Sequence, residues 1–358
     1  MSKLKILENK MALPETMSGV VLTGIGGPDM LEWRDDLPVP IASDSDVIIQ
    51  VKAAAVNNTD INTRNGWYSK GGSSPDDAAW TGYPLKFPRI QGADVCGEIV
   101  AVGAAVDPDR IGERILIEPC LREANGQTLK KPWYFGSECD GGFAQYTRVA
   151  NQYAHAITCD LTDTELASFP CSYSTAENML TRANLREGET ILVTGASGGV
   201  GSAAVQLAQA RGAKVIAVTS ASKAKAMLEL GAVKTIDRGD DLVSSIKANS
   251  VDVVIDLVAG PKWSALLDVL RPHGRYAVAG AIAGPIVEMD VRTLYLKDLS
   301  FFGCTILDSQ VFKNLIKRIE SKEISPLVAE TYSLRDIAKA QSAFSQKGHI
   351  GKIVLELD

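Results

Sequence analysis

A glycine-rich corner at residues 195–201 constrains this chain more than any other segment. It follows a short apolar run, Thr190–Val193, and precedes a proline-free stretch from Ser202 to Arg211. The pattern predicts a buried strand that turns through glycines into a helix. Glycine lets a phosphate approach the main chain, while the helix start supplies unpaired N–H groups and a positive dipole end. We therefore predict a site for the pyrophosphate of a dinucleotide, made by Gly195, Ala196, Ser197, Gly198, Gly199, Val200 and Gly201.

The end of the second predicted strand of this unit indicates which dinucleotide is bound. That strand, Lys214–Thr219, is not followed by the Asp or Glu that usually holds the ribose 2′-hydroxyl of NAD. A carboxylate about 5 Å from a 2′-phosphate would repel it by roughly 3 kcal/mol per charge pair at an effective dielectric near 20. Hydroxyls and lysines attract the phosphate instead, so NADPH is predicted from Ser220, Ser222, Lys223 and Lys225. In the alternative, the two lysines are solvated helix charges.

Strand and helix patterns divide the chain into domains. From Ser18 to about Ala156, short strands punctuated by glycine and proline are typical of a β-rich region. From Thr190, strand and helix alternate, which predicts a doubly wound parallel sheet. We expect an α/β protein with an N-terminal extension (1–16), a β-rich catalytic domain (17–158 and 310–358) and a Rossmann domain that binds NADP (159–309). An exposed loop is predicted at residues 69–84, with Trp80 and Tyr83.

Charge and cysteine content argue against several classes of partner. The 358 residues include 37 lysines and arginines and 43 aspartates and glutamates, a net charge of −6, with no basic run. This disfavours nucleic acid and an anionic membrane surface as ligands. Residues 1–10 lack the apolar core of a signal peptide, and no apolar run approaches the roughly 18 residues of a membrane helix. The six cysteines form no CxxC pair, so we expect a soluble cytoplasmic protein with reduced thiols.

Several motifs, in the same order, resemble the medium-chain dehydrogenase/reductase superfamily over nearly the whole chain from Ser18. Besides the glycine corner, the resembling segments are Gln91–Gly97, Asp140–Tyr146, Val251–Asp256, Leu270–Arg275 and Gly348–Leu355. The resemblance implies a GroES-like β-rich catalytic domain joined to a Rossmann domain. It also implies an oxidoreductase that transfers hydride.

The positions that hold zinc in the alcohol dehydrogenase branch of that superfamily differ in this chain. That branch uses two cysteines and a histidine, and the matching residues are Asn57, Ala93 and Cys171. A catalytic zinc needs about three protein ligands, which one thiol cannot supply. The four-cysteine lobe of the structural zinc is also missing, since only Cys120 and Cys139 lie in that region. We expect neither zinc, and we interpret Cys171 as a small buried residue.

The zinc-free branches that the chain resembles are the quinone oxidoreductases and the 2-enoyl thioester reductases. Asn57, Asp60 and Tyr68 match their N-x-x-D-x-x-x-x-x-G-x-Y pattern, and the resemblance implies that Tyr68 is a proton donor. Without a metal, hydrogen-bond donors suit acceptors that delocalise the incoming charge. We expect hydride transfer from NADPH to a quinone or an α,β-unsaturated carbonyl, with Asn57 orienting the substrate carbonyl or the nicotinamide ribose. Asp60 either belongs to the site or caps a helix, and in the alternative Tyr68 only lines the site.

The resemblance also implies roles for residues elsewhere. Lys352 matches a basic residue that contacts the pyrophosphate, or is a surface lysine beside a strand, and Thr175 matches a hydroxyl near the nicotinamide. The segment Ser300–Thr305 resembles an edge strand that pairs across a two-fold axis, so a homodimer is expected. The histidines are interpreted as structural, namely His155, His273 and His349.

Three functions stay open from the sequence. The first is a zinc-independent NADPH reductase of quinones or enones. The second is a zinc-type alcohol dehydrogenase with an altered site, and the third is a non-catalytic NADPH-binding protein like the lens crystallin relative of quinone oxidoreductases. Fold resemblance does not choose among quinone, enone and enoyl thioester.

Overall fold

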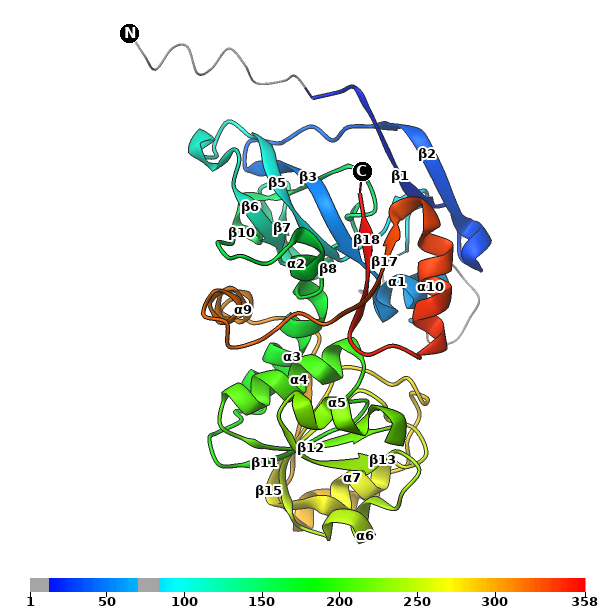
Figure 1. The fold of residues 1–358 in the computed structure, drawn as a ribbon, viewed down its shortest axis with the longest axis vertical. Coiled ribbons are helices and arrows are strands. Elements are labelled where there is room, and N and C mark those ends of the chain that lie inside the picture. Colours follow the sequence, from blue (N-terminus) through cyan, green and yellow to red (C-terminus); the bar gives the residue numbers. More distant parts are fainter. Residues whose placement is uncertain (1–12, 70–83, 358) are drawn as a thin grey trace.

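The computed structural model describes residues 13–69 and 84–357, which form two lobes (Figure 1). The upper lobe in that view is mostly β-strand, and the lower lobe alternates strands and helices. Helices α3 (Pro170–Arg182) and α4 (Gly199–Ala210) lie where the two lobes meet. One continuous apolar core crosses this junction, since it includes Ala53 of the upper lobe, Phe169 beside α3 and Leu207 of α4. The predicted α/β fold class is confirmed.

The upper lobe contains a seven-stranded sheet in the order β10-β6-β5-β3-β18-β17, with β9 also pairing with β3. A smaller sheet has the order β2-β1-β4, and β7 and β8 form a hairpin. The two C-terminal strands enter this lobe, because β18 pairs with β3. The strands are β1 (Thr16–Leu22), β2 (Leu31–Pro38), β3 (Asp46–Ala55), β4 (Arg89–Ile90), β5 (Asp94–Val102), β6 (Arg114–Ile117), β7 (Cys120–Ala124), β8 (Gln127–Tyr134), β9 (Tyr146–Ala150), β10 (Ala154–Ala156), β17 (Val328–Ser333) and β18 (Lys352–Glu356). The accompanying helices are α1 (Asn58–Arg64), α2 (Asp163–Ala167), α9 (Val311–Glu320) and α10 (Ile337–Gln346).

The lower lobe is a six-stranded parallel sheet in the order β13-β12-β11-β14-β15-β16. The central strand is apolar on both faces, as parallel sheets covered by helices require, and its residues Ile191, Leu192 and Val193 are fully buried. The strands are β11 (Thr190–Val193), β12 (Lys214–Thr219), β13 (Ala232–Asp237), β14 (Val251–Asp256), β15 (Leu270–Val278) and β16 (Ser300–Gly303). The helices are α4, α5 (Ala224–Glu229), α6 (Leu242–Ile246), α7 (Trp263–Val269) and α8 (Val291–Leu296).

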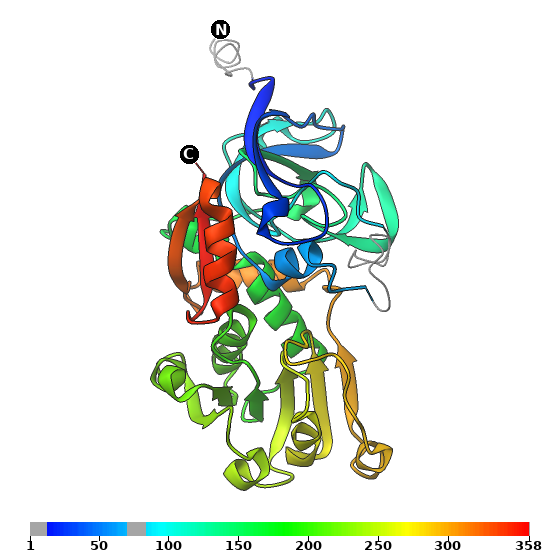
Figure 2. The ribbon, with the colours of Figure 1, turned by 90° about the vertical axis from the view of Figure 1, so that its right-hand side faces the viewer.

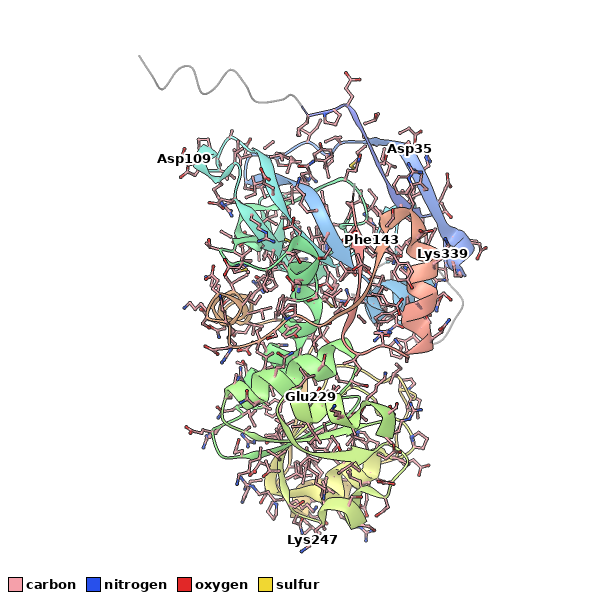
Figure 3. The ribbon with its side chains drawn as sticks, viewed as in Figure 1. Asp35, Asp109, Phe143, Glu229, Lys247 and Lys339 are labelled. Carbon is pink, nitrogen blue, oxygen red and sulfur yellow. The ribbon has the colours of Figure 1, made fainter. Side chains whose placement is uncertain are left out.

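Side chains fill the interior of both lobes (Figure 3). Phe143 lies inside the upper lobe and is completely buried, whereas Asp35 and Lys339 lie at its rim. Across residues 13–69 and 84–357, no helix combines the length and apolar character needed to cross a bilayer. All six cysteines are free thiols.

Some elements begin or end elsewhere than the sequence predicts. Helix α4 starts at Gly199 rather than at Ser202, so the last three residues of the glycine corner belong to its first turn. The edge strand ends at Gly303 rather than at Thr305, and β1 already includes Thr16, the last residue of the predicted extension. Helix α1 and the β7–β8 hairpin were not predicted. The predicted loop, with Trp80 and Tyr83, and most of the N-terminal extension lie outside the described residues.

Candidate active site

The glycine corner has the backbone geometry of a phosphate cradle. Gly195 adopts a left-handed conformation, with φ of +58°, which only glycine adopts without strain. A Cβ on Gly201 would lie 2.2 Å from the carbonyl oxygen of Gly195, so the helix and the turn approach as closely as glycine allows. The first N–H groups of α4, from Gly199, Val200 and Gly201, have no acceptor within their own helix and face the corner. These residues fit a dinucleotide pyrophosphate.

We expect a methyl group at Gly198 to weaken NADPH binding at least about tenfold, or roughly 1.4 kcal/mol. A Cβ there meets only the Gly195 carbonyl oxygen, at 3.5 Å, so the fold tolerates Gly198→Ala while the methyl occupies space where a phosphate approaches. Fluorescence titration with NADPH measures the change. The matched control is Gly24→Ala, whose methyl would meet only Met30 at 3.6 Å. An unchanged dissociation constant would place the pyrophosphate elsewhere.

The C-terminal strand joins the upper lobe to the glycine corner. The amide of Gly351 donates to the carbonyl of Ser197 at 3.3 Å, and Gly351 also forms an isolated bridge with Gly198. The next residue, Lys352, passes its aliphatic stem beside Gly199, since a Cβ on that glycine would lie 3.0 Å from the lysine Cδ. Figure 1 shows β18 descending from the upper lobe toward α4. Lys352 therefore reaches from the catalytic lobe to the cofactor corner.

The ammonium of Lys352 is buried in an ion pair rather than exposed at the surface. Its Nζ lies 2.8 Å from Asp94 Oδ2, and its side chain is 3% exposed. It also donates to Asn57 Oδ1, while Asn57 Nδ2 donates to Asp94 at 2.8 Å and to the Ala55 carbonyl at 3.2 Å. The surface alternative for Lys352 is wrong, because the side chain is enclosed between two packed lobes. Asn57 has partners for its whole amide and holds this ion pair together.

Asp60 lies beneath the same network. Its carboxylate accepts a 2.7 Å hydrogen bond from the backbone N–H of Asn57, at the N-terminus of α1, and it is almost completely buried. Burial raises the pKa of Asp60 to about 7, against the opposing effects of that hydrogen bond and of Lys352. The helix-capping alternative for Asp60 agrees with this geometry.

The structure brings together the three positions that match zinc ligands, but these residues do not fit zinc. Ala93 offers no ligand and the Asn57 amide is already hydrogen-bonded, so Cys171 alone cannot supply the three protein ligands that a catalytic zinc needs. That thiol lies 2.9 Å from the hydroxyl of Tyr134, and both pack against the methyl group of Ala93. Within residues 13–69 and 84–357, no group of three or more His, Cys, Asp or Glu side chains has a metal-binding arrangement.

Tyr68 follows the C-terminal end of α1 along the chain. Its hydroxyl donates to Thr59 Oγ1 at 3.3 Å, and its ring meets Trp67 edge-on at 5.4 Å. Burial raises the pKa of Tyr68, although hydrogen bonds with Thr59 and Asn62 lower it in part. The Tyr68 hydroxyl therefore keeps its proton near neutral pH.

The predicted contacts with a 2′-phosphate divide into two groups. Ser220 and Ser222 lie just after β12, with their hydroxyls 3.2 Å apart. Lys223 reaches back across the lobes and donates to the carbonyls of Lys347 and His349, at 2.8 and 2.6 Å. Lys225 is 90% exposed and pairs with Glu229 at 3.7 Å, as a solvated helix charge does.

One basic residue near the corner was missed by sequence reasoning. Burial and the nearby charges of Lys352 and Lys223 lower the pKa of Lys347 to about 8. The Lys347 ammonium donates to Asn58 Oδ1 at 2.9 Å and lies over the Phe344 ring, while Lys352 is already paired with Asp94. No periodicity marks Lys347, because it follows the end of α10 in a left-handed turn with φ of +55°.

The remaining predicted residues have local partners. The hydroxyl of Thr175 donates to the carbonyl of Cys171 within α3, at 2.7 Å. His155 lies 3.1 Å from Glu118, and His349 stacks 5.3 Å from Phe344. These contacts of His155 and His349 are with residues outside the site.

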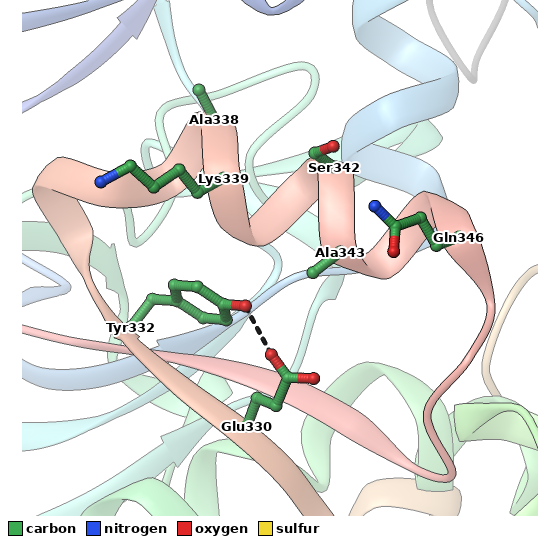
Figure 4. A pocket seen from close by; sticks show the side chains of 7 residues that line it. All are labelled: Glu330, Tyr332, Ala338, Lys339, Ser342, Ala343 and Gln346. Carbon is green, nitrogen blue, oxygen red and sulfur yellow. Dashed lines mark hydrogen bonds between the residues drawn. The ribbon is translucent and has the colours of Figure 1, made fainter.

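A groove of about 570 Å³ lies away from this site, between β17 and α10 (Figure 4). Tyr332 donates to Glu330 on its floor, and Lys339, Ser342 and Gln346 line the helix side. The groove holds no buried ionisable group and does not touch the glycine corner. A substitution in this groove therefore leaves the glycine corner untouched.

Comparisons with known proteins cover both lobes. Residues 43–158 match the family described as alcohol dehydrogenase GroES-like domain, and residues 199–321 the family described as zinc-binding dehydrogenase. The chain is 30% identical over 350 residues to an acryloyl-coenzyme A reductase from Metallosphaera sedula, covering 95% of this chain and 99% of that protein. It is 28% identical over 355 residues to the quinone oxidoreductase of Homo sapiens, covering 95% and 98%. A structure solved as a candidate alcohol dehydrogenase from Sinorhizobium meliloti 1021 matches with a TM-score of 0.91, 44% identity and full coverage of both chains.

Proposed function

Since this chain belongs to the medium-chain dehydrogenase/reductase superfamily of oxidoreductases that bind a nicotinamide dinucleotide, we propose that it reduces a quinone or an α,β-unsaturated carbonyl with NADPH and without zinc. The family resemblance read from the motifs is confirmed. The acceptor, the choice of NADPH over NADH and the independence from zinc are our proposals.

The proposal rests on the side chains that stand at the three positions that match zinc ligands. Asn57 is bound on all sides by Ala55, Asp94 and Lys352, and Ala93 offers only a methyl group. Cys171 contacts the Tyr134 hydroxyl at 2.9 Å. A metal at this point would find a single thiol as its one ordinary ligand among the three positions.

The chemistry of the site suits acceptors that are already activated. Zinc contributes several kcal/mol by stabilising a developing alkoxide, and neutral donors supply only part of that. Quinones and conjugated carbonyls delocalise the charge that hydride brings, so they need less help. When bound, NADPH supplies the hydride. Tyr68 then gives a proton to the reduced acceptor, while Asn57, Asp94 and Lys352 hold the wall of the site in place.

Two features support NADPH. The residues directly after β12 are Ser220, Ala221 and Ser222, none of which is acidic, although the Asp237 carboxylate at the end of β13 accepts a hydrogen bond from the Ala221 amide. Lys223 and Lys347 add positive charge where the lobes meet. This charge attracts NADPH more strongly than NADH, because NADPH carries an additional phosphate.

The test is oxidation of NADPH and NADH, followed at 340 nm with a panel of acceptors. The panel pairs ortho- and para-quinones with enones, an enoyl thioester and simple aldehydes. We expect turnover of conjugated acceptors only, with at least tenfold higher kcat/KM for NADPH. Turnover of simple aldehydes at a similar rate, or a preference for NADH, would contradict the proposal.

We further propose that the protein is a homodimer that joins two copies of β16. This strand forms the edge of the parallel sheet, and Figure 2 shows it as the orange strand at the side of the lower lobe. Phe301 on the strand is 38% exposed, and the segments on either side of the strand along the chain also expose apolar side chains, namely Leu296 of α8 and Ile306. An unpaired edge with such neighbours suits a second identical edge.

Sedimentation of the wild type and of Phe301→Lys tests this assembly. The wild type should have the mass of two chains, and the charged variant should have the mass of one. The control is Val233→Lys, since Val233 is 64% exposed but lies on the opposite edge strand, β13. A wild type of single-chain mass would contradict the dimer.

A further inference from the structure

Asp256 is a completely buried acid to which the proposed reduction assigns no part. It is the last residue of β14, inside the parallel sheet. The hydroxyl of Thr194, the residue that follows β11, donates to its Oδ1 at 2.6 Å, and the hydroxyl of Tyr276 donates to its Oδ2 at 2.6 Å. The indole N–H of Trp263 donates to that phenol at 2.8 Å. Both carboxyl oxygens therefore have hydrogen-bond donors, as a buried acid requires.

The same carboxylate holds the β14 loop, which we define as residues 257–259. The backbone N–H groups of Val258 and Ala259 donate to Asp256 Oδ1 at 2.9 and 3.1 Å, and the N–H of Leu257 donates to the Thr194 hydroxyl at 3.0 Å. Ala259 has a φ of +50°, in the left-handed region that residues other than glycine rarely adopt. Such a conformation persists where its surroundings fix it, and here Asp256 and Thr194 bind three consecutive N–H groups.

The β14 loop packs directly against the glycine corner. A Cβ on Gly195 would lie 3.2 Å from Val258 Cγ2 and 3.8 Å from Leu257 Cβ. Thr194 is the residue immediately before Gly195, so its hydrogen bond to Asp256 joins the start of the corner to the loop that faces it. Val258 itself is only half-buried.

The strand order indicates which half of a dinucleotide lies beside this loop. The sheet runs outward from β11 through β12 on one side and from β14 through β15 on the other. Ligands of such sheets bind outside the carboxyl ends of the strands, at the point where the order reverses. Ser220 and Ser222, the predicted contacts of the 2′-phosphate, follow β12. With the adenosine half there and the pyrophosphate at the corner, the nicotinamide half lies on the side of β14.

We propose that Thr194 and Asp256 are positioning residues for the cofactor, because they hold the β14 loop in the conformation against which the nicotinamide half binds. This assignment rests on the proposed binding of NADPH. A loop that is ordered before binding adds affinity, since its ordering costs nothing when the cofactor arrives. The adenosine half lies across the point where the strand order reverses and does not depend on the loop.

The first test compares the whole cofactor with its adenosine half. Thr194→Val keeps the branched shape but removes the hydroxyl that joins Asp256 to Leu257. We expect the NADPH dissociation constant to rise about tenfold and that of 2′,5′-ADP to stay within about twofold, both measured by calorimetric titration. Thr194→Ser restores the hydroxyl and should restore NADPH affinity. The matched control is Thr190→Val, the same substitution at the other end of β11, which should change neither affinity.

Unchanged NADPH affinity in Thr194→Val would overturn the assignment. Equal weakening of NADPH and 2′,5′-ADP would also overturn it, because that result indicates a general loss of structure rather than a displaced β14 loop. The retained affinity for 2′,5′-ADP thus separates a positioning role from a merely structural one.

A second variant leaves the buried network intact. Val258→Ala shortens a half-buried side chain, so the fold tolerates it, and removes the methyl groups that face Gly195. We expect NADPH affinity to fall about fourfold, the equivalent of one buried CH₂ group, with 2′,5′-ADP unaffected. Unchanged NADPH affinity here would contradict the role of the loop.

The wild type separates this assignment from the proposed function. Preference for NADH would remove the proposed cofactor alone, and the comparison of NADH with AMP then tests the β14 loop in the same variants. A wild type that binds neither NADPH nor NADH would overturn both proposals.

Discussion

Replacing Lys352 with methionine is expected to lower the free energy of unfolding by about 3–5 kcal/mol, because it leaves a buried carboxylate without its counter-charge. The side chains of Lys352 and Asp94 are 3% and 0% exposed, so solvent cannot replace the lost ammonium. The hydrogen bonds from Asn57 and Cys171 to Asp94 stay, but they do not neutralise its charge. Urea denaturation of the apoprotein measures the change.

A second substitution separates lost charge from lost packing. In Asp94→Asn/Lys352→Met the carboxylate that paired with the lysine is neutral as well, so the double variant should recover part of the loss. The exposed control is Lys339→Met, whose lysine pairs with Asp336 at 2.8 Å while 75% exposed, and which should cost less than about 1 kcal/mol. A loss below about 1 kcal/mol in Lys352→Met would mean that the buried ion pair does not exist.

Replacing Tyr68 with phenylalanine is expected to lower kcat about 10²–10⁴-fold at saturating NADPH, the usual contribution of a positioned proton donor. Phenylalanine fills nearly the same volume and loses the hydrogen bonds of the hydroxyl with Thr59 and Asn62, so the fold and the NADPH dissociation constant should not change. Because burial raises the pKa of Tyr68 above its ordinary value of 10.0, the donor form persists at alkaline pH. The wild-type kcat should therefore not fall between pH 6 and 9 on account of this residue.

The distant control is Tyr332→Phe, which removes a hydroxyl from the groove between β17 and α10. It should leave kcat within twofold of the wild type. Unchanged turnover in Tyr68→Phe would remove the proton-donor role and favour the alternative in which Tyr68 only lines the site.

The sequence predicted the fold well where local pattern and tertiary packing agree. The run Thr190–Val193 forms a strand whose last three residues are completely buried, because apolar residues on both faces suit the centre of a parallel sheet. The start of α4 differed by three residues, since Gly198 takes an extended conformation and leaves Gly199 free to begin the helix. Helix propensity alone does not predict glycines in the first turn of a helix. Here a glycine is required at position 201, because any Cβ would collide with the backbone of Gly195.

From the sequence, the residues that form the site could be identified, but the contacts that each of them makes could not. Asn57 was expected to face a substrate or the ribose, but Asp94 and Lys352 use its amide. That pairing depends on β18 lying beside β3, a contact between segments about 300 residues apart that no local pattern carries. For the same reason the burial of Lys352 was left open.

Tyr134 was missed because its position depends on a hairpin. It reaches Cys171, 37 residues further along the chain, only because β7 and β8 fold back together. Polar residues on β8 are mostly exposed, so its pattern gives no sign that the last residue is buried. The sequence carried one sign that a large side chain lies here: Ala93 stands where the related zinc enzymes have a histidine. The smaller alanine leaves space that the Tyr134 ring occupies.

The most direct test of the central claim is turnover by an enzyme of known metal content. The protein is treated with a chelator, its zinc is measured by mass spectrometry, and NADPH oxidation with an enone and a quinone is followed at 340 nm. We predict full activity at a zinc content far below one atom per chain, with no increase when zinc is added. Activity that disappears with the metal and returns with added zinc would contradict the account.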